Sequence, residues 1–361
     1  MHATLDSTMV LDALRVVVDP DLRRDIVSLG FVKNLSIDGG RVSFTVELTT
    51  PACPVKDQLR DQATAAVRAL PGVSDVSVQM SANVRSVSAP ETGRTPLPGV
   101  KNVIAVGAGK GGVGKTTVAV NLALALTQCG SRAGILDADI YGPSVPRLLG
   151  LSGKPQLNEQ KQIKPMQGYG LAVMSMGFLV DEGTPVIWRG PMVISALTQM
   201  LREVAWGGLD VLVVDMPPGT GDVQITMAQQ VPLAGAVIVS TPQDLALIDA
   251  RKGLAMFQQV SVPVLGFVEN MSYFLCPACG ARSDIFDHGG THAEADRLGV
   301  PFLGEIPLHM EIREKSDLGT PIVATAPDSP HAVIYRTIAE RCWAALEGGA
   351  GTKAAPRIVI E

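Results

Sequence analysis

The chain has 361 residues, a net charge of −5, 46% hydrophobic residues and 4% aromatic ones. The length allows one large domain and a small one, and the acidic balance argues against stable binding of nucleic acid. The sequence contains no long apolar run, no secretory-signal pattern and only five cysteines, so we expect a reduced cytoplasmic protein that is not bound to a membrane.

Residues 1–80 have the pattern of a small two-layer α+β domain with the order α-β-β-α-β. Its predicted helices and strands are Thr8–Val18, Phe31–Ile37, Arg41–Leu48, Ala52–Leu70 and Val73–Met80. Residues 81–100 are rich in proline, serine and threonine and lack periodicity, which predicts a linker.

Residues 101–346 alternate apolar strands with helical patterns, and this rhythm predicts a doubly wound, mostly parallel sheet of the α/β class. The predicted strands are Asn102–Val106, Ala133–Asp137, Leu171–Ser175, Val211–Asp215, Ala236–Ser240, Val264–Glu269 and Phe302–Ile306. Helical patterns cover Thr117–Thr127, Ala196–Val204 and Leu245–Gln259. We expect residues 347–361 to form a loose tail.

The first strand of this region leads into the sequence GAGKGGVGKTT at residues 107–117, which fits the phosphate-loop pattern G-x-x-x-x-G-K-S/T. Its glycines leave backbone N–H groups free to converge on a phosphate at the N-terminus of the following helix. Lys115 can reach the terminal phosphates, and the Thr116 hydroxyl can join the shell of a Mg²⁺ ion. The expected nucleotide contacts are Gly109, Lys110, Gly111, Gly112, Val113, Gly114, Lys115, Thr116 and Thr117.

Acidic residues follow two other predicted strands. Asp215 ends one of them, where a carboxylate can serve Mg²⁺. Asp137 and Asp139 are two residues apart and would point to the same side if their strand continued. Their alternative role is to cap helices or turns, but beside a phosphate loop we favour catalysis and metal binding.

Cys276 and Cys279 form a C-x-x-C turn that can bind a soft cation through two thiolates. Three interpretations remain open: a zinc knuckle completed by His288 and His292, a redox pair, or half of a 4Fe–4S site that a second chain completes. Cys129 lies in a helical pattern and is expected in the core.

Cys342 is also expected in the core, because it too lies in a helical pattern. Cys53 lies in the first turn of a predicted helix, where the dipole and the free N–H groups would lower its thiol pKa. For Cys53 a reactive or ligating role and a buried structural one are equally open.

Lys110, Asp137-Ala-Asp139 and Asp215-Met-Pro-Pro-Gly219 resemble the deviant phosphate-loop ATPases of the SIMIBI class that include MinD and ParA. The resemblance implies that Lys110 reaches the nucleotide of a dimer partner, that Asp139 positions the attacking water and that Asp215 serves Mg²⁺. It also implies that Asn270 contacts the base. A second cation at the phosphates would make hydrolysis depend on dimerisation.

The C-P-A-C-G motif at 276–280, Thr241–Asp249, Asn270–Ser272 and Val300–Pro307 closely resemble the Mrp (ApbC) family of iron–sulfur cluster carrier ATPases. Residues 1–80 look like the MIP-type domain of iron–sulfur assembly factors. The resemblance implies a homodimer that binds ATP and Mg²⁺, holds a 4Fe–4S cluster at Cys276 and Cys279, hydrolyses ATP slowly and transfers the cluster to apoproteins. The alternatives are a ParA-like positioning switch and a nucleotide switch with structural zinc.

Overall fold

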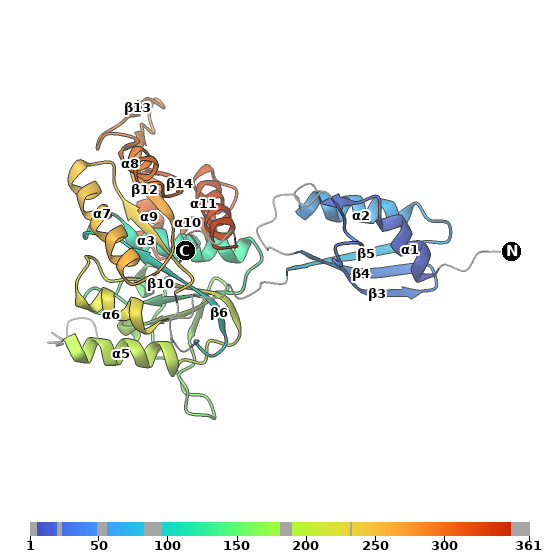
Figure 1. Ribbon diagram of the computed structural model, residues 1–361, viewed down its shortest axis with the longest axis horizontal. Coiled ribbons are helices and arrows are strands. Elements are labelled where there is room, and N and C mark those ends of the chain that lie inside the picture. Colours follow the sequence, from blue (N-terminus) through green and yellow to red (C-terminus); the bar gives the residue numbers. More distant parts are fainter. Residues whose placement is uncertain are drawn as a thin grey trace, which may run out of the picture. The chain divides into compact units, whose positions relative to one another are not determined.

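The computed structural model of the protein describes residues 6–19, 24–48, 56–82, 96–180, 190–231 and 233–347. They fall into two compact units that divide near residue 85 (Figure 1). Cys53, most of the predicted linker and nearly all of the predicted tail lie outside the described residues.

The N-terminal unit is a three-stranded sheet with the order β3-β4-β5, and α1 and α2 pack on it (Figure 1). β3 and β4 are antiparallel, whereas β4 and β5 are parallel. The elements are α1 (Ser7–Leu14), β3 (Val32–Asp38), β4 (Arg41–Leu48), α2 (Lys56–Arg68) and β5 (Asp75–Ala82). Two short strands that the sequence pattern did not predict, β1 (Val18–Asp19) and β2 (Arg24–Asp25), pair with each other.

The C-terminal unit is built on a nine-stranded sheet, and its order is β13-β12-β11-β6-β10-β7-β9-β8 with β14 added beside β12. The strands are β6 (Val100–Gly107), β7 (Ala133–Asp137), β8 (Met166–Gly168), β9 (Leu171–Ser175), β10 (Leu209–Asp215), β11 (Gly235–Ser240), β12 (Val264–Leu275), β13 (Arg282–Ser283) and β14 (Phe302–Leu308). All pairs are parallel except those of β8 with β9 and β12 with β13. The predicted doubly wound sheet is confirmed.

Helices cover both faces of this sheet, as the buried Val, Ile and Leu runs of its strands require (Figure 1). One group packs together around α3 (Lys115–Gln128), α10 (Ile322–Thr325) and α11 (Pro330–Glu347). The other consists of α5 (Gly190–Arg202), α6 (Asp222–Gln230), α7 (Asp244–Gln259) and α8 (Gly290–Leu298). The short α4 (Val145–Leu148) and α9 (Met310–Asp317) contact each other.

β12 is longer than the sequence pattern predicts. The predicted strand ends at Glu269, but β12 continues to Leu275 because its last residues pair with β13 and β14. The register with β14 shifts between Asn270 and Phe274, and Met271 has a φ of 56° there. The strand therefore bends after Asn270 and carries the chain on to Cys276.

No helix in the described parts of the chain has both the length and the apolar character needed to cross a bilayer.

A buried carboxylate joins α7 to α8. Glu294 of α8 is 6% exposed and accepts two hydrogen bonds from Arg251 of α7, at 2.6 and 3.0 Å, and two from Arg297, at 2.5 and 3.1 Å. The hydrogen bonds from Arg297, followed by those from Arg251, lower the pKa of Glu294 to about 2. Because the native carboxyl stays ionised, this contact contributes stability above pH 4.5, the ordinary carboxyl value, and loses it as the pH falls toward about 2.

We expect Glu294→Gln to lower the free energy of unfolding by about 1–3 kcal/mol at neutral pH, since two guanidinium groups lose their ionised acceptor. The difference from the wild type should shrink as the pH falls below 4.5. Urea unfolding at a series of pH values measures both effects. Asp296→Asn, on the exposed side of the same helix, is the matched control and should change stability little; an equal loss in both variants would contradict the assignment.

Candidate functional site

The phosphate loop connects β6 to α3, at the carboxyl edge of the central sheet. Gly112 and Gly114 have φ values of 84° and 79°, a conformation that side chains disfavour. Gly109 lies directly against the backbone of Asp249 in α7, so that a Cβ at this position has no room. The glycines therefore serve two purposes, a left-handed turn and a close approach to α7.

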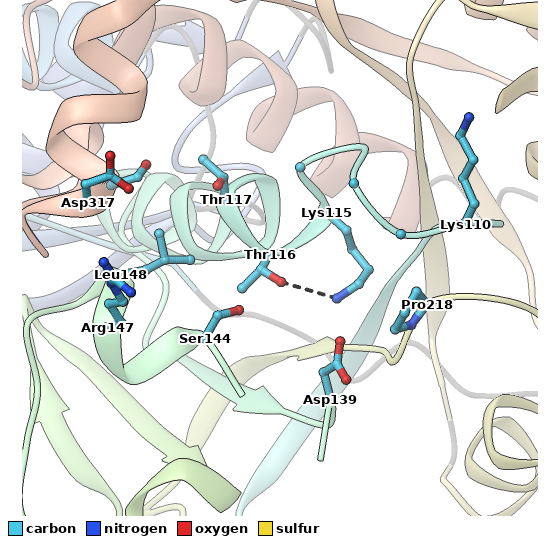
Figure 2. Close-up of a pocket in the computed structure, with 14 residues that line it drawn as sticks. Lys110, Lys115, Thr116, Thr117, Asp139, Ser144, Arg147, Leu148, Pro218 and Asp317 are labelled. Atoms are coloured by element: carbon cyan, nitrogen blue, oxygen red, sulfur yellow. Dashed lines mark hydrogen bonds between the residues drawn. The ribbon is translucent and has the colours of Figure 1, made fainter. Parts of the chain in front are cut away.

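The loop forms one wall of a cavity of about 440 Å³ (Figure 2). Lys110, Lys115, Thr116 and Thr117 line it from the loop and the start of α3, and Asp139 lines it from the segment after β7. Figure 2 shows Lys115 pointing into the cavity and Lys110 extending away from the Lys115 amino group. The structure thus brings together most of the predicted nucleotide contacts.

A buried ion pair lies at the base of this cavity. Lys115 Nζ is 2.5 Å from Asp215 Oδ1, and Thr116 Oγ1 donates to Asp215 Oδ2 at 2.7 Å. Asp215 is fully buried at the end of β10, and burial raises its pKa while Lys115 opposes the rise. The structure thus places Thr116 and Asp215, both expected to serve Mg²⁺, in direct contact. Their Mg²⁺ binding stays a prediction, and the ion pair of Asp215 with Lys115 is a finding that the sequence did not predict.

Asp137 and Asp139 occupy different environments. The two side chains would point to the same side only if the strand continued to Asp139, but β7 ends at Asp137. Asp137 is fully buried and accepts hydrogen bonds from the backbone N–H groups of Asp139, Ser144 and Val145 and from the Ser175 hydroxyl. Burial, with the charge of nearby Asp215, raises the pKa of Asp137 to about 7. Asp139 faces the cavity, whereas Asp137 organises the loop behind it; a Mg²⁺ contact of Asp137 stays a prediction.

Asn270 contacts the phosphate loop from the side. Its amide nitrogen donates to the Val113 carbonyl at 2.8 Å, and it lies against the Cα of Gly114 so closely that a Cβ there would collide with it. Asn270 is 7% exposed. The predicted contact with a base stays a prediction, and the observed bond shows a second role in holding the loop.

Cys276 and Cys279 lie at the tip of the hairpin that β12 forms with β13. The turn closes through hydrogen bonds from Gly280 N to the Cys276 carbonyl, at 2.8 Å, and from Cys276 N to the Ala281 carbonyl, at 2.9 Å. Cys279 is exposed and Cys276 is half-buried. Backbone N–H groups of Ala278 and Cys279 lower the pKa of Cys276, which favours the thiolate.

The histidines considered for a zinc knuckle have other partners. His288 Nε2 is 2.9 Å from Glu305, and His292 stacks on Phe302 with ring centroids 4.3 Å apart. In the described part of the chain, no group of three or more potential metal ligands includes either thiol of the hairpin. The geometry gives no support to a zinc site completed by these histidines within one chain.

The cavity has walls that sequence reasoning missed. Arg147 of α4 and Ser316 and Asp317 at the end of α9 line it opposite the phosphate loop. Neither α4 nor α9 matches a recognised sequence motif, and they come close to the phosphate loop only in the folded chain. The predicted core positions of Cys129 and Cys342 agree with the structure, in which both are buried.

Comparisons with known proteins match both units. A sequence model of the NUBPL iron-transfer P-loop NTPase family matches residues 99–343, and a model of the iron–sulfur cluster assembly protein family matches residues 7–80. The iron–sulfur cluster carrier protein of Synechocystis sp. is 49% identical over 93% of this chain and 97% of its own length. The iron–sulfur cluster transfer protein NUBPL of Dictyostelium discoideum is 53% identical over 72% of this chain and 80% of its own.

Solved structures agree with the fold. A nucleotide-binding protein from Archaeoglobus fulgidus, in complex with ADP, is 39% identical with a TM-score of 0.56, and the match covers 64% of this chain and 90% of that one. The cell division ATPase MinD of Pyrococcus furiosus is 24% identical with a TM-score of 0.50, over 66% of this chain and 97% of its own. The second likeness shows the fold alone.

The close packing of the phosphate loop on α7 leads to a test. We expect Gly109→Ala to lower the free energy of unfolding by about 1–3 kcal/mol, because its Cβ would displace the Asp249 backbone. Gly111→Ala is the control, since no atom lies within 4 Å of its Cβ position. Urea denaturation of both variants without nucleotide measures the difference, and equal stabilities would refute the steric argument.

Proposed function

Because the chain belongs to the NUBPL iron-transfer P-loop NTPase family, we propose that it is a homodimeric, ATP-dependent carrier that binds a 4Fe–4S cluster and passes it to iron–sulfur apoproteins. The observation that carries the proposal is the hairpin with two accessible thiols. The names of its relatives, iron–sulfur cluster carrier and transfer proteins, support the same cargo.

The hairpin of one chain offers too few thiolates for a complete cluster site, and this supports a cluster shared by two chains. A 4Fe–4S cluster takes four thiolates, and Cys276 and Cys279 supply two. A twofold axis through the cluster would bring the same pair from a second copy and complete the shell. Such a site would be exposed to solvent on the hairpin tips, as transfer to another protein requires.

The cavity at the phosphate loop supports ATP binding. The backbone N–H groups of the loop and Lys115 would hold the phosphates, and Thr116 Oγ1 and Asp215 offer the oxygen donors that suit Mg²⁺. Bound Mg²⁺ would offset the charge that develops on the transferred phosphoryl group. The attacking water would be oriented by Asp139, which lines the cavity.

Lys110 supports the dependence of hydrolysis on dimerisation. It lines the rim of the cavity, and no hydrogen bond or ion pair is found for it in the described part of the chain. Because Lys110 extends away from Lys115 of the same chain, it can reach phosphates that are bound to a partner chain and stabilise their charge there. Hydrolysis would then be slow in the monomer and regulated by assembly.

β12 offers a physical link between the two sites. Asn270 holds the phosphate loop, and Cys276 follows six positions later, after the bend at Met271. A movement of the loop on ATP binding or hydrolysis would be transmitted along this strand to the thiols. We propose that the nucleotide state alters cluster retention in this way.

The two lysines should separate binding from hydrolysis. We expect Lys115→Ala to weaken ATP binding by at least about tenfold, because the phosphates lose a charged donor. Lys110→Ala should bind ATP normally but hydrolyse it about a thousandfold more slowly, the lower end of the effect of other cations supplied across an interface. Fluorescent-nucleotide titration and phosphate release measure the two effects. Lys164→Ala, an exposed lysine outside the cavity, should leave both unchanged, and normal turnover in Lys110→Ala would remove its proposed role.

The cysteine pair should carry the cluster. After anaerobic reconstitution with iron and sulfide, we expect Cys276→Ala and Cys279→Ala to lose the thiolate-to-iron absorption and the bound iron. Each substitution removes one thiolate from each of the two chains, and therefore two of the four ligands of the shared cluster. Cys129→Ala, which changes a buried thiol, should keep the cluster. Iron per dimer and the absorption spectrum provide the measurement. Full cluster content in the hairpin variants would disprove the site, and stoichiometric zinc without iron would favour a structural metal instead.

A further inference from the structure

A cluster of two histidines and a glutamate lies where α9 and α11 begin. His309 caps α9, and its Nδ1 accepts a hydrogen bond from the Glu311 backbone at 3.2 Å. His331 is in the first turn of α11. The two imidazole rings are 4.1 Å apart at their centroids and tilted by 41°. The fold thus brings together side chains from the starts of two helices that are separated in the chain by α10.

His331 is buried without the partner that a buried polar group needs. It is 9% exposed, and its Nδ1 makes no hydrogen bond with the described residues. Leaving such a group without a hydrogen-bond partner in the interior is destabilising. The unpaired Nδ1 of His331 points to a bound group beside this ring.

We propose that His309, Glu311 and His331 bind one divalent first-row transition-metal ion. Each residue offers one ligand atom, and these atoms all lie within 4.8 Å of one another. Two imidazole nitrogens and one carboxylate oxygen form a donor set that suits Zn²⁺, Fe²⁺, Co²⁺ or Ni²⁺, and that does not suit Mg²⁺. The ion satisfies the lone pair of His331 and ties α9 to α11.

The cluster can close on an ion with a small movement. Zinc–ligand bonds of about 2.0–2.1 Å place tetrahedral ligand atoms about 3.3 Å apart, so ligand atoms that now lie up to 4.8 Å apart need to approach by up to about 1.5 Å. His309 and Glu311 are half-buried, whereas His331 is buried. Nδ1 of His309 carries the lone pair that accepts from the Glu311 backbone, so binding of the ion at this nitrogen replaces the cap hydrogen bond.

The site is separate from the two described above. Neither thiol of the hairpin belongs to it, and none of its three residues lines the phosphate-loop cavity. α9 nevertheless connects the regions, because Ser316 and Asp317 at its end line that cavity. Binding of the metal ion does not depend on the cluster-carrier proposal and is tested independently of it.

The test uses the full chain with Cys276→Ala and Cys279→Ala, so that the hairpin thiols bind no metal, and with excess Mg²⁺ to occupy other carboxylates. Titration with Zn²⁺ or Co²⁺ alone should show one ion per chain and, for Co²⁺, visible bands of a nitrogen–oxygen site without thiolate charge transfer. His309→Asn, which keeps a helix-capping side chain, and Glu311→Gln should each weaken binding by at least about tenfold. Zn²⁺ should raise the melting temperature of the parent and not of these variants.

His292→Ala is the matched control, because His292 is an exposed histidine outside the cluster. This variant should bind Zn²⁺ as tightly as the parent. His331→Ala should abolish binding; if it does not fold, the other two variants decide the question. The proposal is overturned if the parent binds no stoichiometric ion, or if His309→Asn and Glu311→Gln bind Zn²⁺ as tightly as the parent.

Discussion

The hydrogen bond from Asn270 to the Val113 carbonyl is the contact on which the rest of the site depends. It fixes the phosphate loop to β12, while the tight approach of Gly109 to Asp249 fixes the same loop to α7. Held on both sides, the loop presents the N-terminus of α3 to an anion at a defined angle. The strand that holds the loop is also the strand that leads to the cysteines. A single edge of the sheet therefore supports nucleotide binding and the thiol hairpin.

The burial of the ion pair formed by Lys115 and Asp215 costs free energy. Both side chains are nearly or fully buried, and removing two charges from water offsets much of the energy that their attraction supplies. Hydrophobic residues of the same size would stabilise a domain at least as well. The proposed binding of phosphate and Mg²⁺ gives these charged groups a reason to be buried together, and Thr116 is already in contact with Asp215.

Strong local patterns made much of the fold predictable. The apolar strands around β6 and the phosphate loop could be identified because their signals lie within a few consecutive residues. The extension of β12 could not, because it depends on pairing with β13 and β14. The contacts of Asn270 with Val113 and of Asp317 with the cavity join segments far apart in the chain. The sequence suggested His288 as a partner for the cysteines by proximity alone, whereas the folded chain places it against Glu305.

Met271 shows how a strained backbone restricts which sequences this family member can use. Its φ of 56° lies in the left-handed region, which costs a residue with a side chain about 1–2 kcal/mol. A strand usually accepts valine, isoleucine or threonine most readily, yet these branched residues are the ones that this conformation excludes most strongly. The residue preferences at position 271 are therefore those of a turn, although the position lies within a strand. Substitutions that are conservative by β propensity will be the harmful ones there, while glycine or asparagine will be tolerated.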